Sequence, residues 1–278
     1  MSYIILRDGR KIEFQNTRIM GILNATPDSF FEGSRVNGVE VAQQKALKMI
    51  DEGADILDIG GESTRPGSEP VSEDEEIKRV IPVIEAIRKV NKEIIISVDT
   101  YRAKTAELAI QAGADIINDI SAMMFDKEMI NVIKKYNVPV ILMHIKGTPK
   151  NMQNNPHYND VVKEVYEFLE ERIKFSIDNG IEKSKIITDP GIGFGKLFDH
   201  NIELIKNIEI FKNLGCPVLL AHSRKSSIGV ALGNLPPEER LEGTIAISCY
   251  AALKGIEMVR VHDVKENKRA IRMIEVLR

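Results

Sequence analysis

Cysteine is scarce in this chain of 278 residues, because only Cys216 and Cys249 occur. Two cysteines cannot build a disulfide-stapled scaffold, and such scarcity is typical of a reducing compartment. No apolar run approaches the ~18–20 residues that a membrane-spanning helix requires. Arg7, Asp8, Arg10 and Lys11 interrupt the start of the chain, where a secretory signal peptide would have a continuous apolar region. We therefore expect a cytoplasmic protein with no membrane partner.

The chain also lacks an excess of charge of either sign. Lys and Arg number 38, Asp and Glu number 41, and the formal net charge is -3. This balance argues against a nucleic-acid partner but leaves room for a local anion site. With 43% hydrophobic and 28% charged residues, the composition is that of an ordinary globular protein and argues against a disordered chain. The length is compatible with two modest domains or with one α/β barrel of about 250 residues.

Short β-branched segments recur along the chain and alternate with longer amphipathic stretches. Each short segment is almost continuously apolar and then ends in polar residues, which is typical of parallel strands buried on both faces. The expected strands are Ile19–Asn24, Ile56–Gly60, Ile94–Asp99, Ile116–Asp119, Val140–His144, Ile186–Asp189, Val218–His222 and Met258–His262.

The stretches between these strands have helical periodicity. Val161–Asn179 is the longest, and Ser72 with Glu75 predicts a capping box that opens a helix ending near Val90. Eight strands spaced by about 34 residues predict a (β/α)8 TIM barrel, with an open doubly wound sheet as the alternative. Residues 3–14, with a turn at Asp8-Gly9, predict a β-hairpin before the first strand. No linker divides the chain, so we expect one domain over 1–278 with the hairpin unit in 1–17.

Polar residues follow the apolar run of every expected strand. Because the active face of a barrel lies at the carboxyl ends of its strands, this regularity predicts a ligand site. Each residue alone could instead cap a helix, as Asp263 and Asp119 are placed to do. The residues at the strand ends are Asn24, Glu62 to Arg65, Asp99, Asn118, Asp119, His144, Asp189, Ser223 to Lys225, Arg260, His262 and Asp263.

The set divides by charge. Cationic or potentially cationic side chains are Arg65 and, from the loops after the last two strands, Lys225, Arg260 and His262; barrels often bind phosphate there. Asp99, Asn118 and Asp189 suit a ring with several N–H donors. The composite predicts a ligand with a polar ring and an anionic tail. For Asp99 an alternative is a buried salt bridge to Lys225.

Three loops on this face stand out. Residues 26–33 and 60–67 combine Gly, Pro and polar side chains and are long for strand-to-helix connections, which suggests lids. Phe30 and Phe31 on the first loop are costly to expose unless they close over something apolar, and the alternative is that one of them packs on the barrel rim. Residues 189–196 hold Gly191, Gly193 and Gly195. This spacing fits neither the Walker pattern of P-loop proteins nor the Rossmann pattern of dinucleotide-binding proteins. These glycines are better explained by a close approach to a flat ligand beneath Phe194. The scattered histidines argue against a structural zinc site.

Six segments carry a resemblance to the dihydropteroate synthase family, over nearly the whole chain. They are Gly-Ile-Leu-Asn-Ala-Thr-Pro-Asp-Ser-Phe at 21–30, Asp-Ile-Gly-Gly-Glu-Ser-Thr-Arg-Pro-Gly at 58–67, Ser-Val-Asp-Thr at 97–100, Asp-Pro-Gly-Ile-Gly-Phe at 189–194, Ser-Arg-Lys-Ser at 223–226 and Arg-Val-His-Asp-Val at 260–264. The family folds as a (β/α)8 barrel. The sequence departs from its common pattern at Ala25, Glu32 and His222, and the sequence offers no account of His222.

The resemblance implies that 6-hydroxymethyl-7,8-dihydropterin pyrophosphate condenses with p-aminobenzoate. It implies Asp99, Asn118, Asp189 and Lys225 at the pterin edge, with Met143 and Ile120 packed around the ring. It implies Asn24, Arg65, Arg260 and His262 at the pyrophosphate, with Asn24 also binding Mg²⁺. It implies Thr64, Pro66, Phe194, Lys225 and Ser226 around p-aminobenzoate, with Phe30 on the lid. Lys225, Arg65, Arg260 and His262 would be the catalytic residues.

Two other functions remain compatible with parts of this pattern. A pterin-binding methyltransferase barrel acting with a corrinoid protein would share the acids but not the pyrophosphate cluster. A catalytically silent folate-binding barrel would bind without turnover, although intact Asn24, Arg65, Lys225 and Arg260 argue against a loss of catalytic function.

The segment Leu241–Leu253 is apolar or small nearly all round, which predicts a buried partner surface and a homodimer.

Overall fold

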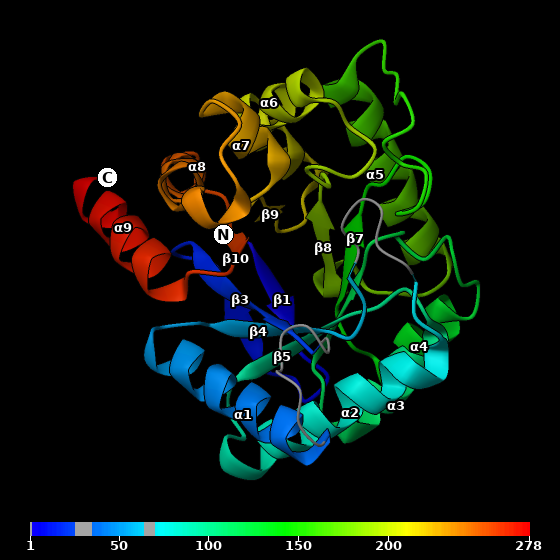
Figure 1. Ribbon diagram of the computed structural model, residues 1–278. Helices are drawn as coiled ribbons and strands as arrows, with labels where there is room; N and C mark the ends of the chain where they lie inside the picture. Colours follow the sequence, from blue (N-terminus) through cyan, green and yellow to red (C-terminus); the bar gives the residue numbers. More distant parts are fainter. Residues whose placement is uncertain (1, 26–34, 64–69) are drawn as a thin grey trace.

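The computed structural model describes residues 2–25, 35–63 and 70–278, and at its centre stands a ring of parallel strands (Figure 1). Neighbouring strands pair in the order β8-β7-β6-β5-β4-β3-β10-β9. A parallel bridge between Thr188 and Val218 joins the two end strands and closes the ring, so the open doubly wound alternative is excluded. The strands are β3 (Arg18–Asn24), β4 (Ile56–Gly60), β5 (Ile95–Asp99), β6 (Ile116–Asp119), β7 (Val140–Met143), β8 (Ile186–Asp189), β9 (Leu219–Ala221) and β10 (Met258–Val261).

Helices surround the strand ring on its outside (Figure 1). Ser72 caps α2, since its Oγ accepts the backbone N–H of Glu75, and Asp160 caps α5 in the same way through Lys163. No helix in the described part of the chain is both long and apolar enough to cross a membrane. The helices are α1 (Arg35–Asp51), α2 (Glu73–Val90), α3 (Ala103–Ala112), α4 (Met129–Tyr136), α5 (Val161–Asp178), α6 (Phe198–Lys206), α7 (Ser226–Ala231), α8 (Leu241–Leu253) and α9 (Val264–Leu277), with 3₁₀ turns at Lys183–Lys185, Ile208–Leu214 and Pro237–Glu239.

The predicted N-terminal hairpin is present and plugs one end of the barrel. Strands β1 (Tyr3–Ile5) and β2 (Lys11–Glu13) pair antiparallel. Ile4, Leu6 and Phe14 of this hairpin unit join one apolar cluster with a residue from every barrel strand. Those barrel residues form the lowest interior layer: Met20, Ile56, Ile95, Ile116, Ile141, Ile187, Leu219 and Met258. The amino-terminal end of the barrel is therefore filled with hydrocarbon.

The next interior layer carries the polar chemistry. Side chains along a strand alternate between its two faces, so the residues two positions after the apolar floor also point inward. The strand pairing places Asp58 beside Ser97, and Asp99 beside Asn118, on neighbouring strands. The layer consists of Ile22, Asp58, Ser97, Asn118, Met143, Asp189, Ala221 and Arg260. A polar layer on an apolar plug forms the floor of a site that opens toward the carboxyl ends of the strands.

Candidate functional site

A buried arginine links two carboxylates at the floor of the barrel. Nε of Arg260 donates to Oδ2 of Asp58 at 2.5 Å, and its Nη2 donates to Oδ2 of Asp99 at 2.8 Å. The same Asp58 oxygen accepts a hydrogen bond from Nδ2 of Asn118 at 3.1 Å. Residues from β4, β5, β6 and β10 are thereby held in one network. The alternative considered for Asp99, a salt bridge to Lys225, is wrong, because the ion pair of Asp99 is with Arg260.

Arg260 also differs from its expected position. The sequence placed it with the cations of the last loops, yet it lies inside β10 and its guanidinium faces the floor acids. Strand pairing explains this, since Arg260 stands two residues after Met258 of the apolar floor and so faces inward. The structure therefore brings the three pterin-edge candidates and Arg260 together, and separates Arg260 from the rim.

Burial shifts the protonation of the floor carboxylates. It raises the pKa of Asp99 to about 7, a rise that the positive charge of Arg260 opposes and the charge of Asp58 reinforces. It raises the pKa of Asp189 to about 6, opposed by the backbone N–H of Gly191 and by the charges of Lys225 and Lys196. Gly191 donates to Oδ1 of Asp189 at 2.7 Å. Both carboxyls can thus change protonation near neutral pH, as groups in functional sites often do.

Lys225 stands over this floor at the start of α7. Its ammonium donates to the carbonyl of Ile192 and lies 4.3 Å from the centre of the Phe194 ring. Desolvation lowers the pKa of Lys225 to about 8, while the negative charge of Asp189 acts in the opposite direction. Lys225 therefore contacts the loop that carries Phe194 and feels the charges of Asp189 and Asp99. Ser226, the next residue, is exposed at the first position of α7.

Two glycines of the 189–196 loop allow the loop backbone to pack closely against the segment that follows β7. Gly191 and Gly195 have positive φ, and a Cβ at either would collide with the carbonyl oxygens of His144 or Lys146. Lys196 holds the loop together, because its Nζ donates hydrogen bonds to the carbonyls of Gly191 and Phe194. The sequence analysis explained these glycines by a close approach of the backbone to a ligand. In the structure, Gly191 and Gly195 instead approach the protein's own backbone at His144 and Lys146.

The buried amine of Lys196 also meets a histidine. Its Nζ lies 2.8 Å from Nδ1 of His144, whose ring packs edge-on against Phe168. Burial lowers the pKa of Lys196 well below its usual value, and it lowers that of His144 likewise. Phe194 itself packs against a small cluster that contains Ile120 and Met143. The pair therefore fixes the loop that carries Phe194 beside the floor.

The rim residue His262 is oriented by a serine. Oγ of Ser223 accepts the backbone N–H of His262 at 3.2 Å and lies 2.9 Å from its Nδ1. Because the oxygen of Ser223 accepts the backbone N–H, its hydroxyl group is free to donate a hydrogen bond to Nδ1 of His262. The contact with Ser223 therefore fixes the orientation of the His262 ring at the carboxyl end of β10. Asn24, the last residue of β3, pairs with Gly60 of β4 at the same end of the barrel.

Four of the expected ligand-binding residues lie outside the described part of the chain. Phe30 belongs to residues 26–34, and Thr64, Arg65 and Pro66 belong to residues 64–69. The other expected site residues lie in the polar layer of the barrel or above it, on the strands or on the segments that follow them: Asn24, Asp99, Asn118, Met143, Asp189, Phe194, Lys225, Ser226, Arg260 and His262.

Two strand-end residues have roles that differ from the expectation or extend it. Asp263 occupies the N-cap position of α9, but its side chain accepts no hydrogen bond from the helix backbone. Its carboxylate instead accepts two hydrogen bonds from the guanidinium of Arg224, at 2.8 and 2.6 Å. Asp119 does bind local backbone, since it accepts the N–H groups of Ser121 and Met123. Both acids support the scaffold.

His222, which the sequence left without explanation, ties β9 to α8. Its Nε2 lies 3.0 Å from the carbonyl of Thr244 and 3.0 Å from Oγ of Ser248. Ser248 in turn donates to Asn267 of α9. Desolvation lowers the pKa of His222 to about 4, so the ring is neutral at pH 7. His222 is a structural connector.

Sequence reasoning missed the roles of Asp58 and Lys196, and it named Ser223 as a strand-end residue without its role toward His262. Asp58 lay inside an apolar run rather than at its end, and the signal that could have found it is the two-residue alternation along β4. Ser223 was one of a row of polar residues with no feature that distinguished it. Lys196 followed the glycine run, where a charged side chain normally faces water.

The donor set at the rim bears on metal binding. No group of three or more His, Cys, Asp or Glu side chains within the described residues could hold an ion. Asn24 offers one neutral amide oxygen, and Asp58 and Asp99 are engaged by Arg260. Such a set fits Mg²⁺, which keeps several waters and often binds through one side chain plus the phosphates of a substrate. It does not fit a metal held by protein ligands alone.

Comparison with known proteins gives a consistent result over the full chain. The family model described as "Pterin binding enzyme" matches residues 20–262, from β3 to just beyond β10. A curated relative from Clostridium beijerinckii, named dihydropteroate synthase, is 50% identical over 264 residues, which cover 95% of each chain. The solved structure of Xanthomonas albilineans dihydropteroate synthase with 4-aminobenzoic acid has a TM-score of 0.92 and 41% identity, covering 100% of this chain and 98% of that one. A second Xanthomonas albilineans structure, in complex with 7,8-dihydropteroate, has a TM-score of 0.88 and 39% identity over 97% of each chain.

Proposed function

The chain belongs to the family of pterin-binding enzymes, and from this membership and the geometry we propose its reaction and the residues that carry it. It is a transferase of the dihydropteroate synthase type, which condenses 6-hydroxymethyl-7,8-dihydropterin pyrophosphate with p-aminobenzoate. The products are 7,8-dihydropteroate and pyrophosphate. The observation that carries this conclusion is the full-length likeness to such synthases, combined with a polar layer above a hydrocarbon plug.

The pterin ring binds at the floor. Asp99, Asn118 and Asp189 present carboxylate and amide oxygens at one end of three strands, which suits the several N–H donors of a pterin edge. Lys225 closes the ring from above, and Met143 packs beside it with Ile120. The network of Asp58, Arg260 and Asn118 supports this assignment, because it fixes donors and acceptors before the ligand arrives.

p-Aminobenzoate binds nearer the rim, against Phe194 and Ser226. The ammonium of Lys225 lies over the Phe194 ring, so an aromatic carboxylate between loop and helix would have both an apolar wall and a cation at hand. The family resemblance adds Thr64, Pro66 and Phe30. In this arrangement Lys225 stands between the two substrates.

The pyrophosphate binds at the rim cations. His262 is oriented at the rim by its hydrogen bond with Ser223. The resemblance adds Arg65 and also Arg260, whose guanidinium lies below the rim and pairs with Asp58 and Asp99. Asn24 would hold Mg²⁺ together with phosphate oxygens and water, and the ion would neutralise charge on the leaving group.

The reaction follows from charge. The bond between the pterin methylene carbon and the pyrophosphate oxygen breaks, and its electron pair leaves with pyrophosphate. The aniline nitrogen then bonds to the methylene carbon and releases its proton to water. Because this nitrogen is already nucleophilic, no strong base is needed. The protein residues orient the reactants, and the rim cations stabilise the departing anion.

We also propose that the protein is a cytoplasmic homodimer that pairs through the α7–α9 side of the barrel. Helix α8 buries the small residues Thr244, Ser248, Ala251 and Ala252, while Leu253 is 55% exposed. On the adjoining helix α9, Met273 and Val276 are more than half exposed. Apolar surface of this kind often marks an interface. Light scattering should give twice the chain mass of 31.2 kDa, and a mass near 31.2 kDa would refute the dimer.

A coupled assay of pyrophosphate release tests the function. With Mg²⁺ present, release from the pterin pyrophosphate should depend on added p-aminobenzoate and should stop when the metal is chelated. Release that is indifferent to p-aminobenzoate would indicate a pyrophosphohydrolase and would overturn the proposal. Binding of the pterin without any release would favour the silent folate-binding barrel.

A further inference from the structure

We infer that Arg102 is a positioning residue that fixes the stem of the connection between β4 and α2, and through it the p-aminobenzoate side of the site. This inference deepens the proposed function and rests on it. Arg102 lies just before α3 and outside the set of expected ligand-binding residues. It holds residues on both sides of the segment that carries Thr64, Arg65 and Pro66.

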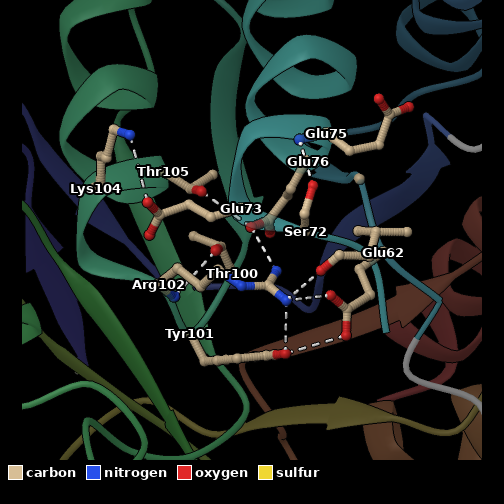
Figure 2. A network of polar contacts seen from close by, with 12 residues as sticks. Glu62, Ser72, Glu73, Glu75, Glu76, Thr100, Tyr101, Arg102, Lys104 and Thr105 are labelled. Atoms are coloured by element: carbon tan, nitrogen blue, oxygen red, sulfur yellow. Dashed lines mark hydrogen bonds and ion pairs between the residues drawn. The ribbon is translucent and has the colours of Figure 1, made fainter. Parts of the chain in front are cut away.

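The guanidinium of Arg102 joins the two ends of that connection. Its Nη2 donates to Oε2 of Glu62 at 2.7 Å and to the carbonyl of Val71 at 2.8 Å. Glu62 follows the end of β4, and Val71 precedes Ser72, the cap of α2. One side chain from a third element therefore binds the chain where it leaves the barrel and again where it enters the helix. Figure 2 shows Arg102 in the middle of these contacts.

A second set of contacts fixes the guanidinium itself. Its Nη1 donates to Oε2 of Glu76 at 2.7 Å, and the hydroxyl of Thr105 donates to the same oxygen at 2.9 Å (Figure 2). The Tyr101 hydroxyl donates to Oε1 of Glu62 at 3.1 Å, and the Tyr101 ring packs under the guanidinium. Arg102, Glu62 and Glu76 have side chains only 14%, 6% and 1% exposed.

Such a buried cluster is better suited to positioning than to general stability. Buried ion pairs repay their desolvation only when the geometry is good, and they are best explained by the arrangement they specify. Here the fork of arginine reaches two carboxylates and a carbonyl at once, which the single ammonium of lysine cannot reproduce. Tyr101 also packs against the cluster of Met143, Ile120 and Phe194, so the stem borders the substrate site.

The chain offers a matched control in Arg88. Its side chain is 18% exposed and pairs with Asp115, and its other nitrogens donate to the carbonyls of Gly113 and Ile94. Arg88 thus resembles Arg102 in burial, and its guanidinium has three hydrogen-bond partners where that of Arg102 has four. It lies in the last turn of α2, at the opposite end of the barrel from the proposed substrate site. Loss of either arginine costs stability, but only Arg102 should affect the substrates.

The test compares Arg102→Lys with Arg88→Lys in the full-length protein. Arg102→Lys should raise KM for p-aminobenzoate by about tenfold or more, since small displacements of substrate-positioning groups can cost up to about 100-fold. The dissociation constant of hydroxymethylpterin without its pyrophosphate should change less than about twofold, because the floor residues are untouched. Arg88→Lys should lower Tm to a similar extent and leave both constants unchanged.

Two results would overturn the inference: an unchanged KM for p-aminobenzoate in Arg102→Lys, or an equal rise in Arg88→Lys. If Arg102→Lys fails to fold, Glu62→Gln replaces it and should raise the same KM, whereas an unchanged KM would overturn the inference. Failure of the proposed function is distinguishable, since the wild-type protein would then show no release that depends on p-aminobenzoate.

Discussion

Removal of Asp58 tests whether the floor network organises the pterin site. Asp58 is fully buried, and one of its oxygens accepts from both Arg260 and Asn118. Asp58→Ala leaves the Nε of Arg260 and the amide of Asn118 without this acceptor inside the barrel. Both donors are then expected to turn toward other acceptors, which would displace the groups that meet the pterin edge.

The magnitude follows from the burial of the pair. Breaking a buried ion pair by removing one partner costs about 3–5 kcal/mol. Because Arg260 keeps its bond to Asp99, we expect the lower end, about 3 kcal/mol of unfolding free energy. At about 2–4 °C per kcal/mol for a chain near this size, Tm should fall by roughly 6–12 °C. Binding of hydroxymethylpterin should weaken by about tenfold or more, equivalent to at least ~1.4 kcal/mol.

Calorimetry of unfolding and of pterin binding measures both effects. Asp58→Asn is the matched control, because its amide oxygen can still accept from Arg260 and Asn118. Its Tm should fall by less than half as much as that of the alanine variant. An alanine variant with unchanged Tm and unchanged pterin affinity would refute the role of the network. Equal losses in both variants would show that the charge matters and the acceptor does not.

Two other outcomes follow from the same geometry. Asp189→Asn should weaken pterin binding by more than about tenfold, because the new amide places an NH₂ donor where the N–H groups of the pterin require an accepting oxygen. Unchanged pterin affinity, measured by calorimetry, would contradict the assignment. The pKa of Asp189 is raised to about 6 and that of Lys225 lowered to about 8. Below the first value the carboxyl gains a proton, and above the second the amine loses one. The value of kcat/KM should therefore peak between these two pH values, and a profile flat across both would exclude these groups.

The sequence was sufficient to predict the architecture because each strand and its polar end have a local signature. The expected strands agree with the observed ones to within one or two residues, and α8 has the predicted bounds. The hairpin at Asp8-Gly9 formed as expected. Residues at the ends of apolar runs, such as Asp99 and Asp189, were recognised because the barrel brings all such ends to one face.

What the sequence could not give depends on contacts between distant segments. Asp58 and Arg260 are 202 positions apart, and their ion pair exists only because the barrel closes between β10 and β3. The clamp of Arg102 on Glu62 and Val71 likewise depends on how α2 and α3 pack. Asp263 had the position of a cap, but a nearby arginine competes for its carboxylate. Pairing of this kind follows from tertiary structure and leaves no local pattern.

The most direct test of the account is a product balance in a single incubation. The protein with Mg²⁺, hydroxymethyldihydropterin pyrophosphate and p-aminobenzoate should form 7,8-dihydropteroate and pyrophosphate in equal amounts, as measured by chromatography with mass detection. Omission of p-aminobenzoate should abolish both products. Pyrophosphate that accumulates without dihydropteroate would contradict the central claim.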